Sequence, residues 1–331
     1  MKINKNKFPI VLSILILFSS KAFPVASGTT VFDFLKLPKN ATQAALASMS
    51  SFGRNTSMPN PAVLGLVDKY NIQATHASHI QDVSYNTAYI AVPIRIIPDS
   101  LEYGKMSKVR KTDYFATPIK KAVLSIMYDG LDYGKMDRVR EADDGDYKKD
   151  GFFSAGDSCV QINAGQQISK EVCVGSGIKY VKNDIDGSSL SGMAIDLAAL
   201  YLSKTYWSLA GGLENVGFKV DKYNLPSNAY IAYKNSLSES FDIGFELKTF
   251  FDGIIQLKGA FEINRDQVFF LRGGYSCPVN NNNDSLGEWY KRNLSFGFGI
   301  NIKKLFSIDY AWLPFGELGN MSIFSLKVEF K

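Results

Sequence analysis

The sequence predicts an all-β protein, a membrane-spanning antiparallel β-barrel of about 14 strands preceded by a short N-terminal hatch. Three observations support this prediction. Apolar and polar residues alternate over runs of eight or nine residues, as in FDIGFELK (241–248) and LSFGFGINI (294–302). Such alternation gives each strand one apolar and one polar face. The runs follow one another in series along the chain, and no stretch of ~20 apolar residues after the N-terminus could form a membrane helix.

The bulk composition limits the classes of function. The chain has 331 residues, of which 21% are charged and 13% aromatic, and this composition argues against disorder. The net charge is +5, but Lys and Arg are scattered and do not form a basic face with aromatic residues. We therefore expect no nucleic-acid binding.

Residues 1–22 have the three parts of a secretory signal peptide. Lysines precede the apolar run PIVLSILILF (9–18), and small residues follow it, ending at Ala22. We expect cleavage after Ala22 and export of the rest of the chain. The alternative is an uncleaved N-terminal anchor.

Residues 23–66 differ from the rest of the chain and predict the hatch. The stretch KNATQAALASMSSF (39–52) has helical spacing behind Asn40, a good N-cap, and a turn-rich stretch follows it. We expect this segment to plug the barrel; the alternative is a periplasmic tail packed on the rim. The apolar patch where the hatch meets the wall would consist of Phe32, Phe34 and Leu35.

The barrel itself is expected over residues 67–331. Its predicted strands lie near 71–80, 84–97, 121–130, 156–166, 170–181, 190–202, 205–215, 228–236, 240–250, 253–263, 266–276, 291–302, 305–314 and 320–330. Short connections mostly fall on one rim and long ones on the other, which is typical of outer-membrane barrels. Long strands, aromatic strand ends and glycines on the polar face favour this fold over a secreted soluble β-sandwich, the remote alternative.

Charged residues of both signs recur on the polar faces of two neighbouring predicted strands, 240–250 and 253–263. A Lys facing lipid at mid-bilayer would cost ~2–4 kcal/mol, so these residues are expected to face the interior. They would either hold the hatch through an ion-pair network or line a pathway. The residues are Asp242, Glu246, Lys248, Lys258 and Glu262.

No arrangement of residues predicts catalysis, so we expect neither enzyme activity nor a cofactor. The sequence has no G-x-S-x-G elbow and no Walker loop. Its two histidines, His76 and His79, are three residues apart in a predicted strand and therefore face opposite ways. Its three cysteines form no C-x2-C pair, so no metal site is expected.

One ten-residue motif occurs twice. LEYGKMSKVR (101–110) lies between the second and third predicted strands, and LDYGKMDRVR (131–140) follows the third. The similarity ends after ten residues, which excludes a solenoid. We expect the second copy to end strand three and enter a long loop. The first would be a local insertion, either a docking loop or a tolerated surface connection.

Several segments resemble the PorV/PorQ family of outer-membrane proteins. They include SGTTVFDFLKLP (27–38), NPAVLG (60–65), GFFSAGDSCVQINAGQQIS (151–169), SGMAIDLAALY (191–201) and the last three strands (294–330). The resemblance implies a fourteen-stranded barrel like the fatty-acid transporter FadL, located in the cell outer membrane. It also implies a hatch-to-barrel junction at Asn60 and Pro61.

The resemblance further implies a function and a route. The expected function is passage of hydrophobic or amphipathic small molecules, with outer-membrane lipid and such a ligand as partners. In FadL-like proteins a kink in the third strand opens the wall sideways to the bilayer, and here Asp129 and Gly130 occupy that position. Some PorV-like members instead shuttle or attach proteins in type IX secretion, which makes a secreted protein cargo the alternative partner.

Overall fold

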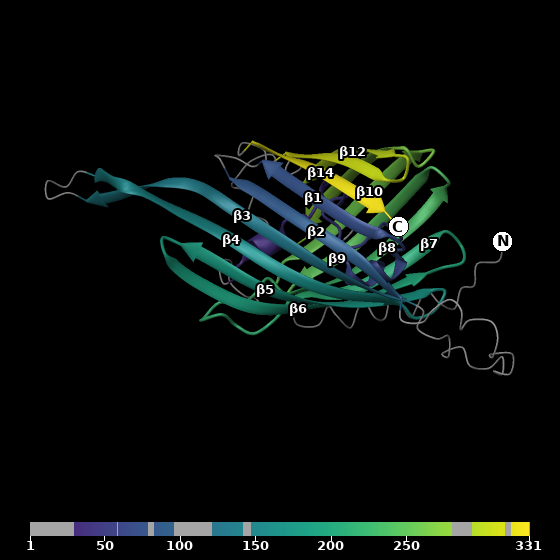
Figure 1. Ribbon diagram of the computed structural model, residues 1–331, viewed down its shortest axis with the longest axis horizontal. Helices are drawn as coiled ribbons and strands as arrows, with labels where there is room; N and C mark the ends of the chain where they lie inside the picture. Colours follow the sequence, from purple (N-terminus) through teal and green to yellow (C-terminus); the bar gives the residue numbers. More distant parts are fainter. Residues whose placement is uncertain are drawn as a thin grey trace.

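The computed structural model describes residues 30–57, 59–78, 83–95, 121–141, 147–279, 293–314 and 319–330. They form a single closed barrel of fourteen antiparallel strands, in which each strand pairs with its neighbours along the chain and β14 closes on β1 (Figure 1). The predicted fold is confirmed, and a single closed sheet rules out the two-sheet sandwich. Among the described residues, no helix is long and apolar enough to cross a membrane.

All fourteen predicted strands are present. They are β1 (Tyr70–Ser78), β2 (Ser84–Arg95), β3 (Lys121–Glu141), β4 (Tyr147–Gln167), β5 (Val172–Ile185), β6 (Ser188–Leu202), β7 (Trp207–Val216), β8 (Asn228–Ser238), β9 (Phe241–Phe250), β10 (Ile255–Arg265), β11 (Phe269–Pro278), β12 (Leu294–Ile302), β13 (Phe306–Pro314) and β14 (Asn320–Phe330). Before β1 come the 3-10 helix η1 (Asp33–Lys36), the α-helix α2 (Ala41–Ala45) and the 3-10 helix η2 (Pro61–Leu66).

The prediction that strand three ends near residue 130 and enters a long loop is wrong. β3 and β4 each have 21 residues, so the motif LDYGKMDRVR (131–140) lies within β3. At ~3.4 Å per residue each strand is about 70 Å long, and the hairpin projects beyond the rest of the sheet (Figure 1). Side chains on both faces of the projecting part are mostly exposed. Its sequence therefore lacks the alternation of apolar and polar residues by which the other strands were predicted. The first copy, residues 101–110, lies outside the described residues.

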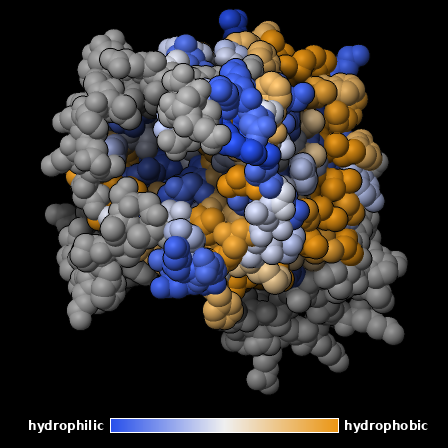
Figure 2. All heavy atoms as spheres, turned by 90° about the vertical axis from the view of Figure 1, so that its left-hand side faces the viewer, coloured by the Kyte–Doolittle hydropathy of each residue, from blue (hydrophilic) through white to orange (hydrophobic). Residues whose placement is uncertain are grey.

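The strands turn apolar side chains outward and polar ones inward. In β1, for example, Ile72 is 43% exposed, whereas its neighbour Asn71 is only 2% exposed. Seen from the end where the β3–β4 hairpin projects, apolar residues cover the right-hand side of the outer wall, and hydrophilic residues lie in the hollow (Figure 2). The exposed apolar residues include Ile126, Ile162, Ile178, Phe245, Leu257, Phe298 and Phe324. A surface this apolar is suited to lipid rather than to water.

The segment before β1 lies inside the barrel and runs from one rim to the other. At the long-loop rim, where β7 connects to β8, the backbone N–H of Val31 donates to the carbonyl of Asn224 at 2.9 Å. α2 packs on β11 to β14 and η2 on β3 to β6, on opposite sides of the barrel. Val67 then leads into β1 at the short-turn rim, where β12 connects to β13. Asn40 caps α2 as predicted, since its side-chain oxygen accepts from the N–H of Gln43 at 2.8 Å.

Glycines on the inner wall make room for this segment. A Cβ atom added to Gly175 in β5 would lie 2.3 Å from the carbonyl carbon and oxygen of Pro61. A Cβ added to Gly165 in β4 would lie 2.3 Å from the same oxygen. Another on Gly297 in β12 would meet the Cβ of Ala45 at 2.5 Å. At these three glycines the inner segment lies directly against the wall.

The close contact at Gly175 can be tested with Gly175→Ala. We expect the added methyl group to loosen the inner segment or to destabilise the fold by about 1–3 kcal/mol, because it overpacks a backbone contact. Limited proteolysis of the folded barrel should then cut residues 39–66 faster than in the unchanged protein. Gly259→Ala is the matched control, since its Cβ would lie 3.7 Å from the nearest atom. Equal resistance of both variants would contradict the proposed packing.

Candidate ligand cavity and inner segment

The structure separates the five predicted hatch residues into two groups. Phe32, Phe34 and Leu35 are each at most 5% exposed and belong to one apolar cluster, which also contains Val220 of the β7–β8 connection. Asn60 and Pro61 lie at the other end of the inner segment, in and next to η2. The Asn60 side-chain oxygen accepts from the N–H of Ala62 at 2.8 Å and so caps η2.

An ion pair of the wall holds the middle of the inner segment. Lys258 in β10 lies 3.2 Å from the carboxylate of Glu246 in β9. The Lys258 ammonium also donates to the carbonyl of Ser48 at 2.7 Å, and the N–H of Ser50 donates to Glu246 at 2.6 Å. Both charged residues are nearly inaccessible. Of the two sequence-based interpretations, the geometry of this pair fits a network that holds the hatch.

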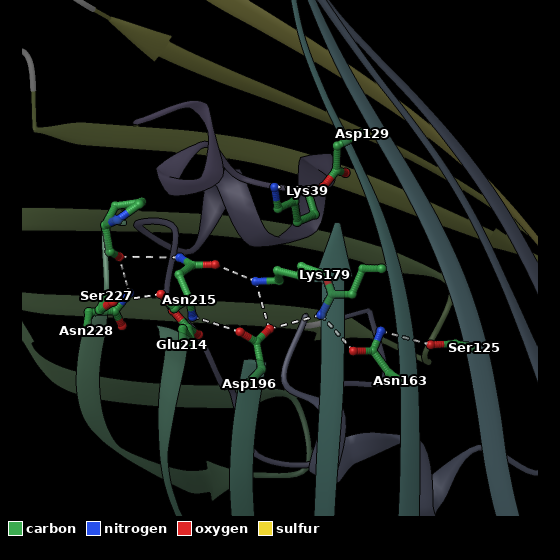
Figure 3. Close-up of polar contacts among 12 residues, drawn as sticks. Lys39, Ser125, Asp129, Asn163, Lys179, Asp196, Glu214, Asn215, Ser227 and Asn228 are labelled. Atoms are coloured by element: carbon green, nitrogen blue, oxygen red, sulfur yellow. Dashed lines mark hydrogen bonds and ion pairs between the residues drawn. The ribbon is translucent and has the colours of Figure 1, made fainter. Parts of the chain in front are cut away.

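A second attachment joins Lys39 of the inner segment to strand β3. Its ammonium lies 2.9 Å from the carboxylate of Asp129 and donates to the hydroxyl of Tyr85 at 3.1 Å (Figure 3). Its carbonyl accepts from the hydroxyl of Thr87 at 2.8 Å. Lys39 and Asp129 are 7% and 1% exposed. Sequence analysis missed Lys39, because a lysine beside a helix cap carries no sign of a partner some ninety residues away.

Strand β3 is unbroken at Asp129 and Gly130. Asp129 faces Thr87 in β2 and Cys159 in β4, and the pairing continues in register on both sides. The first irregularity in the β3–β4 ladder comes later, between Asp132 and Lys135. The wall is therefore closed at the position predicted for a lateral opening.

A further polar network lies on β4 to β7 and was not predicted. Lys179 lies 2.8 Å from Asp196 and donates to the side-chain oxygen of Asn215 at 2.6 Å (Figure 3). Gln161 also donates to Asp196, at 2.9 Å. Each of these residues is at an inward position of its strand, which was the only signal available in the sequence.

The other predicted lining residues divide between two places. Lys248 lies 2.9 Å from Glu214 in β7, beside the polar network. Asp242 pairs with Lys234 at 2.8 Å, and Glu262 pairs with Arg272 at 2.6 Å. The positions of Asp242 and Glu262 in their strands place them toward the short-turn rim, away from Lys248.

A cavity of about 280 Å³ lies between the inner segment and the wall. Its apolar lining residues include Leu35, Leu37, Phe250, Ile254, Leu313 and Met321. Its polar lining residues include Lys179, Asp196, Glu214, Asn228, Lys248 and Lys258. A space of this size is at the lower end of ligand pockets, which typically have ~300–1,000 Å³.

A second, smaller space of about 30 Å³ lies beside the first. It is lined by Asn60, Pro61, Gln73 and Ser125 among others, and shares Lys39 and Pro59 with the large cavity. Its volume is about that of one water molecule. Lys39 and Pro59 therefore lie between the two spaces.

Comparison with solved structures shows what this architecture is similar to. The toluene transporter TbuX of Ralstonia pickettii aligns with a TM-score of 0.54 and 12% identity over 91% of this chain and 100% of that chain. The toluene transporter TodX of Pseudomonas putida aligns with a TM-score of 0.54 and 11% identity over 91% and 98%. A FadL homologue of Pseudomonas aeruginosa aligns with a TM-score of 0.51 and 10% identity over 89% of this chain and 99% of that chain. Neither a known protein family nor a curated protein matches the sequence.

At these identities the likeness shows the fold. The chain has the fold of a FadL-like outer-membrane β-barrel with fourteen strands. Membership of the PorV/PorQ family stays a prediction.

The role of the Glu246–Lys258 pair can be measured with Glu246→Ala. This change leaves the Lys258 ammonium buried without its carboxylate, so we expect a loss of about 3–5 kcal/mol in the free energy of unfolding. Asp184→Ala is the control, because it breaks the exposed Lys182–Asp184 pair and should cost less than ~1 kcal/mol. Urea unfolding in detergent micelles gives both values. Equal losses would show that the buried pair has no special role.

Proposed function

We propose that the protein is an outer-membrane channel for hydrophobic or amphipathic small molecules, with residues 23–66 as its hatch. The observation that carries this proposal is the 280 Å³ cavity inside a closed barrel, separated from the smaller space by Lys39 and Pro59. The apolar outer wall supports a location in the outer membrane, and the fold shared with two toluene transporters supports transport. We assign no catalytic role to any residue.

Passage in this proposal requires movement of the hatch. The large cavity has the volume for a small ligand, whereas the smaller space beside it has room only for water. The Lys39–Asp129 ion pair ties the part of the hatch between the two spaces to strand β3. Because Asp129 belongs to the strand proposed to open sideways, breaking this pair would free both the hatch and the wall at Asp129 and Gly130.

The gate can be tested with Lys39→Met and Asp129→Asn. Each variant removes one member of the ion pair, so we expect uptake of toluene by cells that produce the variant to rise several-fold. Asp242→Asn is the matched control, because it breaks the Lys234–Asp242 pair between two wall strands, and among the described residues neither member of this pair forms a hydrogen bond or an ion pair with the hatch. Heat-shifted gel mobility would verify that each barrel is folded. Uptake equal to that of the unchanged protein in both gate variants would contradict this mechanism.

A second candidate function is docking of a secreted protein, as in a type IX-like accessory barrel. The observation that favours it is the projecting part of the β3–β4 hairpin. In the ladder, residues 133–141 and 147–153 pair only with each other, so both backbone edges are open to another strand. Val139, Tyr147 and Phe152 are 53%, 75% and 67% exposed there.

Replacing residues 134–154 by a two-residue turn separates the two functions. The barrel wall does not depend on this part, so we expect small-molecule uptake to stay within about twofold of the original. Protein docking by the hairpin would instead show as loss of a secreted protein from the cell surface, measured by quantitative proteomics of surface fractions. An unchanged surface proteome would argue against docking at this hairpin.

A further inference from the structure

The charges around the large cavity are already balanced. Each lysine in its lining has a carboxylate within 3.2 Å: Lys36 has Asp33, Lys39 has Asp129, Lys179 has Asp196, Lys248 has Glu214 and Lys258 has Glu246. A ligand with an anionic head group would add a charge that no lysine is free to match. At Lys39, Lys179, Lys248 and Lys258 it would have to displace a carboxylate whose side chain is at most 17% exposed, and such displacement is unfavourable. Only the Lys36–Asp33 pair, at the edge of the lining, is partly exposed.

One polar group of the cavity wall, in contrast, lacks a partner. Asn228 begins β8, lines the cavity and is 1% exposed. Its amide nitrogen contacts the carbonyl of Pro226 at 3.4 Å, which orients the amide. Its side-chain oxygen has no hydrogen-bond partner among the described residues. A buried acceptor of this kind is stabilised by a ligand that brings a hydrogen-bond donor.

The surroundings of Asn228 are polar on one side and apolar on the other. Across the sheet it faces Glu214 in β7 and Phe250 in β9. Lys248, which lies next to Glu214, has further N–H groups that can donate to a ligand oxygen. The hatch residues Leu35 and Leu37 add to the apolar side.

From these features we propose that the cavity binds an uncharged amphiphile that carries a hydroxyl group. Its hydroxyl donates to the side-chain oxygen of Asn228 and accepts from Lys248, while its apolar body lies against Leu35, Leu37 and Phe250. The volume of about 280 Å³ restricts the ligand to a small molecule. This inference rests on the proposed channel function and specifies the class of substrate.

The first test compares three probes of the same chain length on the unchanged full-length barrel held in an amphipathic polymer. The probes are 1-hexanol, hexanoate and hexane, and saturation-transfer NMR titration gives their dissociation constants. We expect 1-hexanol to bind about tenfold more tightly than hexanoate or hexane. Hexanoate or hexane binding as tightly as the alcohol, or no binding of any probe, would overturn the inference.

The second test asks whether Asn228 recognises the hydroxyl. Asn228→Leu keeps the size of the side chain but removes the acceptor, so binding of 1-hexanol should weaken about tenfold and binding of hexane should not weaken. Asn71→Leu is the matched control, since Asn71 is also buried with an unpartnered side-chain oxygen but does not line either cavity. Unchanged binding of 1-hexanol by the Asn228 variant would overturn the role of this residue.

The two proposals can fail separately. Hatch gating is judged by uptake in the Lys39 and Asp129 variants, which does not depend on the head group of the ligand. Preference for hexanoate together with raised uptake would reject the uncharged ligand and retain the channel. Unchanged uptake in those variants together with preference for 1-hexanol would reject the gate and retain the binding site.

Discussion

The pairing of charged groups inside the barrel is the constraint on which the rest of the structure depends. The outward faces of the strands are apolar, so the wall places many of its ionic groups in the interior, where water is scarce. There they form pairs between neighbouring strands, such as Lys258 with Glu246 and Arg272 with Glu262. Removing one member of such a pair leaves a buried charge without compensation, whereas losing an exposed pair changes little.

The same groups attach the inner segment to the wall. Lys258 and Glu246 form hydrogen bonds with the backbone in the middle of this segment. Asp129 forms an ion pair with the segment's Lys39. Wall glycines such as Gly175 let its backbone lie directly against the sheet. The plug is therefore held by a few ionic contacts and by close backbone packing. The ionic contacts can be broken without unfolding a strand, and this suits the movement proposed for the hatch.

A barrel whose interior charges are balanced differs from one that collects anions. Every lysine of the cavity lining has its carboxylate, and among the described lining residues the side-chain group left without a partner is an uncharged acceptor, the amide oxygen of Asn228. The structures that share this fold include two toluene transporters, and toluene has no polar group. Recognition of a polar ligand head group would thus depend on individual inward side chains and not on the barrel fold that these proteins share.

The sequence by itself determined the number of strands, their inward and outward faces and the capped start of helix α2, because each of these is a local pattern of period two or a local cap. Charges on neighbouring strands, such as Glu246 and Lys258, could be expected to meet for the same reason. Only the tertiary structure decided which distant residues pair, as with Lys39 and Asp129, and where the cavity lies, because both depend on how the inner segment threads the closed barrel. It also decided the length of β3 and β4, since a hairpin beyond the sheet has no apolar face to mark it in the sequence.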